Sequence, residues 1–224
     1  LLNVGVQFLR EHMEPEFRIH YAITDTGGFS PNVVQPKAEV LYLIRATSNA
    51  KAKALRDRVD QIAKGAALMT DTQLEMDFIK ACSNTVPNNI MVDLMQANME
   101  SIPLPEYTDE EHAFAKSVIA SYENPGNNLE KRLPNMTEEN ADKFRAHLHD
   151  DINAFVLPKP LQVEHGGGST DVGDVSQVCP TVFLTAATEA ANTPGHSWQY
   201  VCQGKGSIAH KGMLWAAKVM AGTA

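Results

Sequence analysis

The sequence predicts an α/β protein in two parts: a small α+β sandwich over residues 1–86 and an α/β segment over residues 87–224. Three observations lead to this class. Up to residue 82, the helical spacing of apolar residues alternates with the period-two spacing of strands. After Pro87 the pattern changes to amphipathic helices, and a short apolar run there predicts one buried strand. No internal repeat occurs in either part.

The first part is predicted to form helices that cover one face of an antiparallel sheet. No Ser, Thr, Asp or Asn precedes its first helix, so the chain starts inside a helical pattern. The glycines of TGGFSPN can take the positive φ of a turn between two strands, and Ser48 or Asn49 can cap the second helix. In order, the predicted elements are a helix at 1–13, strands at 18–25 and 40–44, a helix at 51–69 and a strand at 72–83.

The second part is predicted to be mainly helical. Thr108 precedes a helix whose first turn is acidic, which favours a helix start, and Ser207 is a candidate cap for the last helix. Residues 124–165 are polar and interrupted by proline, and no regular element is predicted there. The predicted elements are helices at 88–102 and 108–122, a strand at 180–187 and a helix at 207–224.

The composition is that of an ordinary globular chain and excludes several classes of function. Hydrophobic residues make up 43% and charged residues 21%, which permits a sizeable core. The net charge of −8 disfavours nucleic acid as a partner, because phosphate binding needs concentrated positive charge. No apolar run reaches the roughly 18 residues of a membrane span. Cys82, Cys179 and Cys202 are scattered, which predicts small buried residues in a reducing compartment, the cytoplasm.

The segment EHGGGSTDVGDVS at residues 164–176 is the first candidate site. Three consecutive glycines leave backbone N–H groups accessible, and such a segment can cradle an anion. An ordinary glycine turn before a capped helix explains the same residues, and both interpretations stand at this point. The segment lacks the Lys-Ser/Thr ending of a P-loop, which argues against nucleotide binding.

Two histidines are further candidates. His196 lies in the Pro-Gly turn of NTPGHSWQ, where a neutral imidazole is well placed as a metal ligand, although a lone loop histidine is more often a surface residue. His20 and Asn32 flank the predicted hairpin, and His20 is either solvated or a donor aimed into a neighbouring site. Lys80 and Arg45 either bind a substrate carboxylate or are surface charges. No HExxH pattern accompanies these residues.

Four segments carry a resemblance to a known family: IHYAITDTGGFSPNVVQPKAEVLYLIRA, GSTDVGDVSQVCPT, TPGHSWQ and QGKGSIAHKGMLWAAK. Together they resemble the co-catalytic metallo-amidohydrolase family, which includes glutamate carboxypeptidases, aminoacylases, carnosinases and indoleacetyl-amino-acid hydrolases. The resemblance covers residues 1–224 and is weakest at 124–160. It implies a lid and dimerisation domain at 1–86, followed at 87–224 by the C-terminal half of a metallopeptidase-like α/β catalytic domain.

The resemblance also implies roles for individual residues. His196 matches the last metal ligand of the family, and His20 matches a lid histidine that reaches the active site of the opposite subunit and hydrogen-bonds the oxyanion. Asn32 matches a lid residue near the bound substrate, while Lys80 lies near a position where relatives have a carboxylate-binding arginine. The substrate-facing glycine loop of the family corresponds to Gly167, Gly168, Ser169, Thr170 and Asp171, with the last residue expected to orient the loop.

For activity, the resemblance implies a metal-dependent amidohydrolase with two divalent ions, Mn²⁺ or Zn²⁺, which acts on p-aminobenzoyl-glutamate as a homodimer through the lid. It leaves open whether a smaller homologous subunit takes part. In the family, most metal ligands and the general-base glutamate precede the lid, so this chain alone is expected to be inactive. The alternatives are a dipeptidase or another N-acyl-amino-acid amidohydrolase, and a non-catalytic dimerisation or peptide-binding module.

Overall fold

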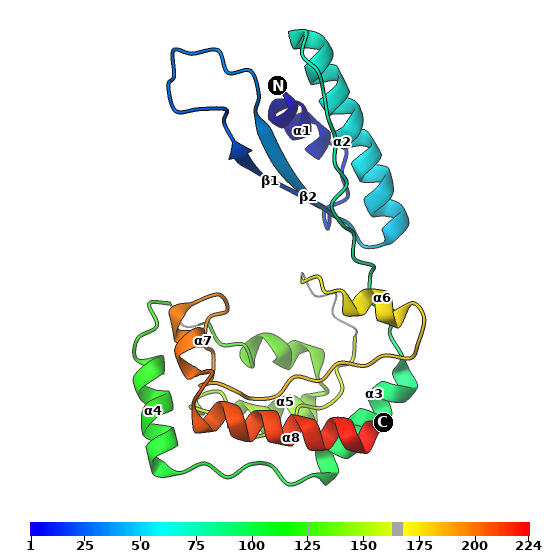
Figure 1. Ribbon diagram of the computed structural model, residues 1–224. Coiled ribbons are helices and arrows are strands. Elements are labelled where there is room, and N and C mark those ends of the chain that lie inside the picture. The colour runs from blue at the N-terminus through cyan, green and yellow to red at the C-terminus, as the bar shows by residue number, and fades with distance from the viewer. Residues whose placement is uncertain (125, 163–167) are drawn as a thin grey trace. The chain divides into compact units, whose positions relative to one another are not determined.

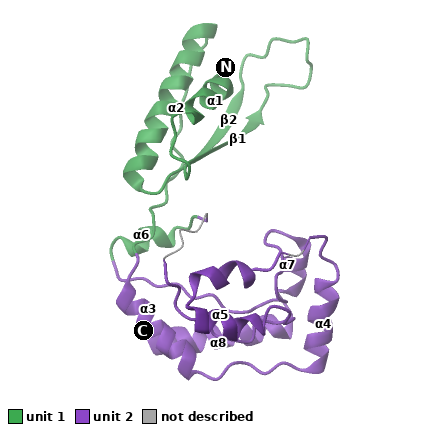
Figure 2. Ribbon diagram, turned by 180° about the vertical axis from the view of Figure 1, so that it is seen from behind, with its two compact units in different colours: residues 1–86, 169–178 green, residues 87–168, 179–224 purple. Residues whose placement is uncertain are grey.

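The computed structural model describes residues 1–124, 126–162 and 168–224, which form two compact units. Unit 1 comprises residues 1–86 and 169–178, and unit 2 comprises residues 87–168 and 179–224 (Figure 2). The chain therefore first passes between units where the sequence pattern changes, and a short later segment returns to unit 1. Within the described ranges, no helix combines the length and the apolar character that crossing a membrane requires.

Unit 1 contains an antiparallel hairpin whose one face is covered by two helices (Figure 1). The buried side chains of Val6 and Leu9 from the first helix, Ile19 from the hairpin, and Leu55 and Val59 from the long helix form its core. This agrees with the predicted helices on one face of an antiparallel sheet. Its elements are α1 (Leu2–Arg10), β1 (Arg18–Asp25), β2 (Glu39–Arg45), α2 (Asn49–Thr70) and α6 (Val172–Ser176).

Local signals in unit 1 produce the predicted turn and cap. Gly27 and Gly28 have φ values of +78° and +154°, conformations that residues with a Cβ atom rarely adopt. Ser48 is the N-cap of α2, because its hydroxyl accepts a hydrogen bond from the Lys51 amide at 3.4 Å. Asp71 ends α2 in the left-handed conformation.

The predicted third strand at residues 72–83 is wrong. Among the described residues, β1 and β2 pair only with each other, and residues 72–83 carry no strand. Alternation alone does not make a strand, because the ladder of hydrogen bonds requires the backbone of a partner. The apolar residues of the segment remain partly or largely exposed, including Phe78, which the Arg56 guanidinium covers at 5.0 Å from the ring centroid.

Unit 2 is built mainly from helices, as predicted (Figure 1). Helix α3 packs against the last helix, α8, through the buried side chains of Met95, Trp215 and Val219. The Asn98 side chain adds a hydrogen bond to the Gly222 carbonyl oxygen at 3.1 Å. Its elements are α3 (Asn89–Ser101), α4 (Asp109–Ile119), the 3₁₀ helix η1 (Glu130–Asn135), α5 (Glu138–Arg145), α7 (Trp198–Gln203) and α8 (Ser207–Thr223).

Two further expectations fail in unit 2, and one stretch whose structure the sequence left open is found to be helical in part. Residues 180–187 form no strand: Val182 and Leu184 pack against the α3–α8 core while Phe183 is 51% exposed, so the run is apolar on one side only. Gly206 rather than Ser207 is the N-cap of α8, because Ser207 is already the first residue of the helix. The stretch 124–165, for which no element was predicted, contains η1 and α5.

The prediction that the cysteines are buried is also wrong. Cys82, Cys179 and Cys202 are exposed, and none of these three residues forms a disulfide. On α7 the buried positions are occupied by Gln199 and Gln203, so the helix places the Cys202 side chain on the solvent side. Composition does not reveal which face of a short helix is buried.

Candidate functional site

His196 stands at the end of a turn in unit 2 whose backbone is fixed on both sides. Its φ is +59°, a left-handed conformation that histidine adopts more readily than most non-glycine residues. The next residue, Ser197, caps α7: its hydroxyl accepts a hydrogen bond from the Tyr200 amide at 3.2 Å and donates one to the Pro194 carbonyl at 2.6 Å. The cap therefore holds the candidate ligand in a conformation that costs about 1–2 kcal/mol.

The loop before this turn is held by a buried glutamine. Gln203 is 2% exposed, and its Oε1 accepts a hydrogen bond from the Ala190 amide at 2.7 Å. Its Nε2 donates to the Thr193 hydroxyl at 3.1 Å and to the Gln199 carbonyl at 2.8 Å. The Tyr122 hydroxyl completes the network with a 2.7 Å hydrogen bond to the Thr193 hydroxyl. Sequence reasoning missed Gln203, whose spacing of four from Gln199 on one helix face is the only local signal.

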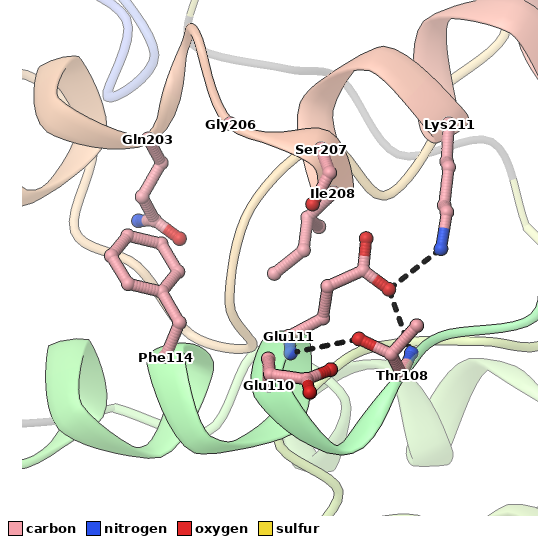
Figure 3. A pocket seen from close by; sticks show the side chains of 9 residues that line it. All are labelled: Thr108, Glu110, Glu111, Phe114, Gln203, Gly206, Ser207, Ile208 and Lys211. Atoms are coloured by element: carbon pink, nitrogen blue, oxygen red, sulfur yellow. Dashed lines mark hydrogen bonds and ion pairs between the residues drawn. The ribbon is translucent and has the colours of Figure 1, made fainter.

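A cavity of about 470 Å³ lies in unit 2, where the start of α4 meets the start of α8 (Figure 3). Glu111 dominates its polar chemistry: the carboxylate pairs with Lys211 Nζ at 2.6 Å and accepts a hydrogen bond from the Thr108 amide at 2.7 Å. The lining residues are Thr108, Glu110, Glu111, Phe114, Gln203, Gly206, Ser207, Ile208 and Lys211. None of them is a site residue predicted from the sequence.

Glu111 is a structural group and a poor candidate for a catalytic base. Its desolvation raises the pKa, but hydrogen bonds from Lys211, Ser207 and the Thr108 amide outweigh this and hold the pKa at about 2. A carboxylate with so low a pKa is a weak proton acceptor at neutral pH. The Ser207 hydroxyl, expected to cap α8, contributes to the stabilisation of this carboxylate instead.

In unit 1, His20 and Asn32 are both exposed. His20 lies on β1 opposite Leu43 of β2, while its neighbour Ile19 is buried beneath the helices. Since side chains alternate across a strand, His20 points away from α1 and α2. Asn32 lies in the hairpin loop, where its Oδ1 accepts a hydrogen bond from the Ser30 hydroxyl at 2.8 Å.

The predicted glycine loop is partly described. Gly167 lies outside the described residues, and a Cβ added at Gly168 would meet open space. Ser169 accepts a hydrogen bond from the Arg45 guanidinium at 3.0 Å, so Arg45 contacts the candidate loop. The Thr170 hydroxyl donates to the Asp171 carboxylate at 3.3 Å.

The following helix, α6, holds residues 169–171 in unit 1 through Asp174, a residue of the candidate segment to which the sequence assigned no role. The Asp174 carboxylate accepts a hydrogen bond from the Ser83 amide at 2.9 Å, across 91 positions of sequence. Hydrogen bonds from the Ser83 hydroxyl and amide lower the pKa of Asp174 below its ordinary value. That Asp171 orients the loop remains a prediction, whereas Asp174 accepts a hydrogen bond that joins α6 to Ser83.

The predicted site residues thus fall into two groups, one in each unit. His20, Asn32 and residues 169–171 belong to unit 1, whereas Gly168 and His196 belong to unit 2. Within the described ranges, no three His, Cys, Asp or Glu side chains come together as metal ligands do. The described residues therefore do not fit a complete metal centre, and His196 stands as a single candidate ligand.

Comparison with known proteins relates the chain over its full length to hydrolases, although no family model matches it. One relative is a subunit of the p-aminobenzoyl-glutamate hydrolase of Escherichia coli (strain K12), which is 44% identical over 227 residues. A second is Xaa-Arg dipeptidase of Mus musculus, 25% identical over 227 residues. Each comparison covers 100% of this chain but only 47% and 40% of the relatives, so the chain spans about half of their length.

Proposed function

We propose that this chain forms the lid and the C-terminal half of the catalytic domain in a metal-dependent amidohydrolase that cleaves p-aminobenzoyl-glutamate into p-aminobenzoate and glutamate. The observation that carries the proposal is 44% identity along the whole chain to a relative named for that hydrolysis. The left-handed backbone of His196, held by a capped helix and the buried Gln203, supports a functional role for this turn.

The residues of this chain bind and polarise the substrate in the proposed reaction. Water adds across the amide: the C–N bond breaks, the hydroxyl joins the benzoyl carbon, and a proton goes to the glutamate nitrogen. Negative charge develops on the former carbonyl oxygen, where a preorganised hydrogen-bond donor is worth about 2.7–4 kcal/mol. We assign that donor to His20 of a second subunit, and contacts with the glutamate portion to Asn32 and the glycine loop.

The two divalent ions, Mn²⁺ or Zn²⁺, belong to the same proposal. When bound, such ions activate a water molecule by lowering its pKa. His196 is the ligand that this chain would contribute, and the described residues bring together no group of three His, Cys, Asp or Glu side chains that could supply the others. Metal binding is therefore proposed for the assembled enzyme and not for these residues alone.

The test is hydrolysis of p-aminobenzoyl-glutamate with added Mn²⁺, followed by chromatographic detection of p-aminobenzoate. It compares the 224-residue chain with the product of the whole open reading frame. We expect activity in the whole product, at least about 100-fold lower after His196→Ala, because second-shell changes alone cost metal sites about 10–100-fold. His149→Ala, a change at another exposed histidine of unit 2, should leave the activity within about twofold of wild type.

Each result decides a separate part of the proposal. Activity in the 224-residue chain would contradict the idea that it lacks catalytic groups. Full activity in His196→Ala would remove the ligand assignment. If the whole product binds Mn²⁺ but leaves p-aminobenzoyl-glutamate intact, the proposed substrate is wrong. If it binds no metal and shows no hydrolysis, a non-catalytic dimerisation or peptide-binding module is the better interpretation.

Dipeptide hydrolysis is the second candidate, because the relative named Xaa-Arg dipeptidase also matches the whole chain. The two candidates differ in the group that leaves as an amine. Parallel assays of p-aminobenzoyl-glutamate, other N-acyl amino acids and dipeptides ending in arginine separate them by the ratio of kcat/KM values. A preference for the dipeptides would replace the proposed substrate.

For partners, we propose a homodimer through unit 1. The hairpin face opposite the helices exposes Leu41 and Leu43 by 46% and 52%, next to His20. A smaller homologous subunit is also compatible with the first relative, whose name describes it as one subunit of its enzyme. The lack of a disulfide among Cys82, Cys179 and Cys202 supports a reducing compartment, and we place the enzyme in the cytoplasm.

A further inference from the structure

We infer that Asp174 is a positioning residue that fixes residues 169–171 of the glycine loop in unit 1 through hydrogen bonds to the backbone of residues 83–86. The inference rests on the proposed function, in which residues 168–171 contact the substrate. It extends that function by naming the groups that set the place of this loop. All the contacts that carry it lie inside unit 1.

Three hydrogen bonds form what we call the Asp174 clasp. The Ser83 amide donates to the Asp174 carboxylate at 2.9 Å, and the Val86 amide donates to the Ser176 hydroxyl at 2.9 Å. The Gln177 side-chain amide donates to the Asn84 carbonyl oxygen at 2.7 Å. Every side chain of the clasp comes from α6 or the residue after it, and every backbone group comes from residues 83–86. The short helix therefore supplies partners for a segment that has no strand or helix of its own.

Close packing reinforces the clasp. A Cβ added at Gly173 would lie 2.0 Å from the Ser83 carbonyl oxygen, so α6 approaches the backbone as only glycine permits. The Ser176 side chain is buried, and its hydroxyl also donates a hydrogen bond to the Gly173 carbonyl oxygen at 2.6 Å. The Ser83 hydroxyl accepts a hydrogen bond from the Asn49 side chain at 2.9 Å, which ties the clasp to the start of α2.

The described part of the loop, residues 168–171, contacts unit 1 through Ser169, which accepts a hydrogen bond from Arg45 at 3.0 Å. A Cβ added at Gly168 would meet open space. Because α6 follows directly, its attachment to residues 83–86 determines where residues 169–171 lie. Loss of the clasp should therefore displace the loop without removing any group that contacts substrate.

Hydrogen exchange of the 224-residue chain tests the clasp without any activity. We compare wild type with Asp174→Ala, Asp174→Asn and Ser176→Ala, using peptides that cover residues 82–87 and 168–178. Asp77→Ala is the matched control, an exposed aspartate of the same unit. In Asp174→Ala both peptides should exchange about tenfold faster, since a hydrogen bond to a charged group is lost. Asp174→Asn keeps an acceptor for the Ser83 amide and should be intermediate, whereas Asp77→Ala should match wild type.

The second readout is the split between KM and kcat in the chain that hydrolyses p-aminobenzoyl-glutamate. Asp174→Ala should raise KM about five- to tenfold and leave kcat within about twofold, because a displaced binding loop weakens uniform substrate binding. Asp174→Asn should recover part of the KM. A variant that only destabilised the fold would lower the active fraction, and hence kcat, instead.

The outcomes separate this inference from the proposed function. Unchanged exchange in both peptides of Asp174→Ala and Ser176→Ala overturns the clasp, whatever the wild-type activity. Faster exchange with unchanged KM overturns the positioning role. A wild-type enzyme that is inactive on p-aminobenzoyl-glutamate overturns the proposed function, while faster exchange in the variants still supports the clasp.

Discussion

At the scale of single residues, the loop before the candidate metal ligand His196 is held by Gln203, for which no ligand-binding role is proposed. His196 is exposed, but the loop that leads to it is joined to the buried side chain of Gln203. An amide can satisfy one backbone donor and two acceptors at once, which few other side chains of this size can do. The loop that leads to the histidine is thus held by a residue seven places further along the chain.

We predict that Gln203→Ala destabilises the protein by about 1–3 kcal/mol, since it leaves the buried Ala190 amide without an acceptor. Chemical denaturation monitored by circular dichroism measures the change. Gln203→Leu should be no better, because it fills the space but restores no acceptor. Gln162→Ala, at an exposed glutamine of the same unit, is the control and should shift stability by less than about 0.5 kcal/mol. Equal stability of Gln203→Ala and the control would contradict the bridging role.

Several residue roles could be predicted from sequence because their signals are local. Thr108 with Glu111 three residues later forms the reciprocal capping box found at the start of α4. The role of Gln203 could not be predicted, because its partners are set by the fold. The identity of Asp174 as an anchor was hidden for the same reason, since its acceptor oxygen meets an amide 91 positions away.

At the scale of elements, an ion pair joins α4 to α8, and its carboxylate is largely removed from water. The Glu111 side chain is 8% exposed and Lys211 is 33% exposed, with 2.6 Å between the charged atoms. The same glutamate closes the capping box of α4, so one side chain stabilises a helix start and a helix–helix contact. Both contributions depend on the ionised carboxylate.

We predict that this contact makes the protein less stable in acid. The pKa of Glu111 is lowered from 4.5 to about 2, so its stabilisation is full above the unfolded pKa and is lost as pH falls through 2. Thermal unfolding between pH 2 and pH 6 should show Glu111→Gln to be less sensitive to pH than wild type. Glu138→Gln, at an exposed first-turn glutamate of α5, should keep the wild-type pH dependence. Parallel curves for wild type and Glu111→Gln would contradict the assignment.

Helices were predicted better than strands for a physical reason. The spacing that makes a helix amphipathic lies within one segment, so α2, α3 and α4 were predicted from residues that are close in sequence. A strand also requires a partner, and residues 72–83 and 180–187 show the alternation without one among the described residues. The missed α5 had a local signal, since Thr137 caps a helix with acidic residues first and basic residues last.

At the scale of the whole molecule, unit 1 presents a hairpin that has a covered and an uncovered face. The covered face packs on α1 and α2, while the other carries His20 beside Leu43, which is 52% exposed. Exposed apolar strand faces of this kind are typical of interaction sites. In the proposed enzyme, this face brings a histidine to a second subunit.

We predict a homodimer in which Leu43→Asp lowers the association constant at least about tenfold, which corresponds to about 1.4 kcal/mol. A charge placed at an apolar interface loses water without gaining a partner. Sedimentation velocity over a concentration series measures the change, with circular dichroism to confirm folding. Leu161→Asp, at a 61% exposed leucine of unit 2, is the matched control. A wild-type chain that sediments only as a monomer would contradict the prediction.

The return of residues 169–178 to unit 1 has a consequence for the order of events during translation. The ribosome releases residues 83–86 long before it makes α6, so the Ser83 and Val86 amides meet only solvent while unit 2 begins to emerge. Domains generally fold as units in the order of their synthesis, but unit 1 is not one continuous stretch of chain. The nascent protein can close its first unit only after most of the second has been synthesised.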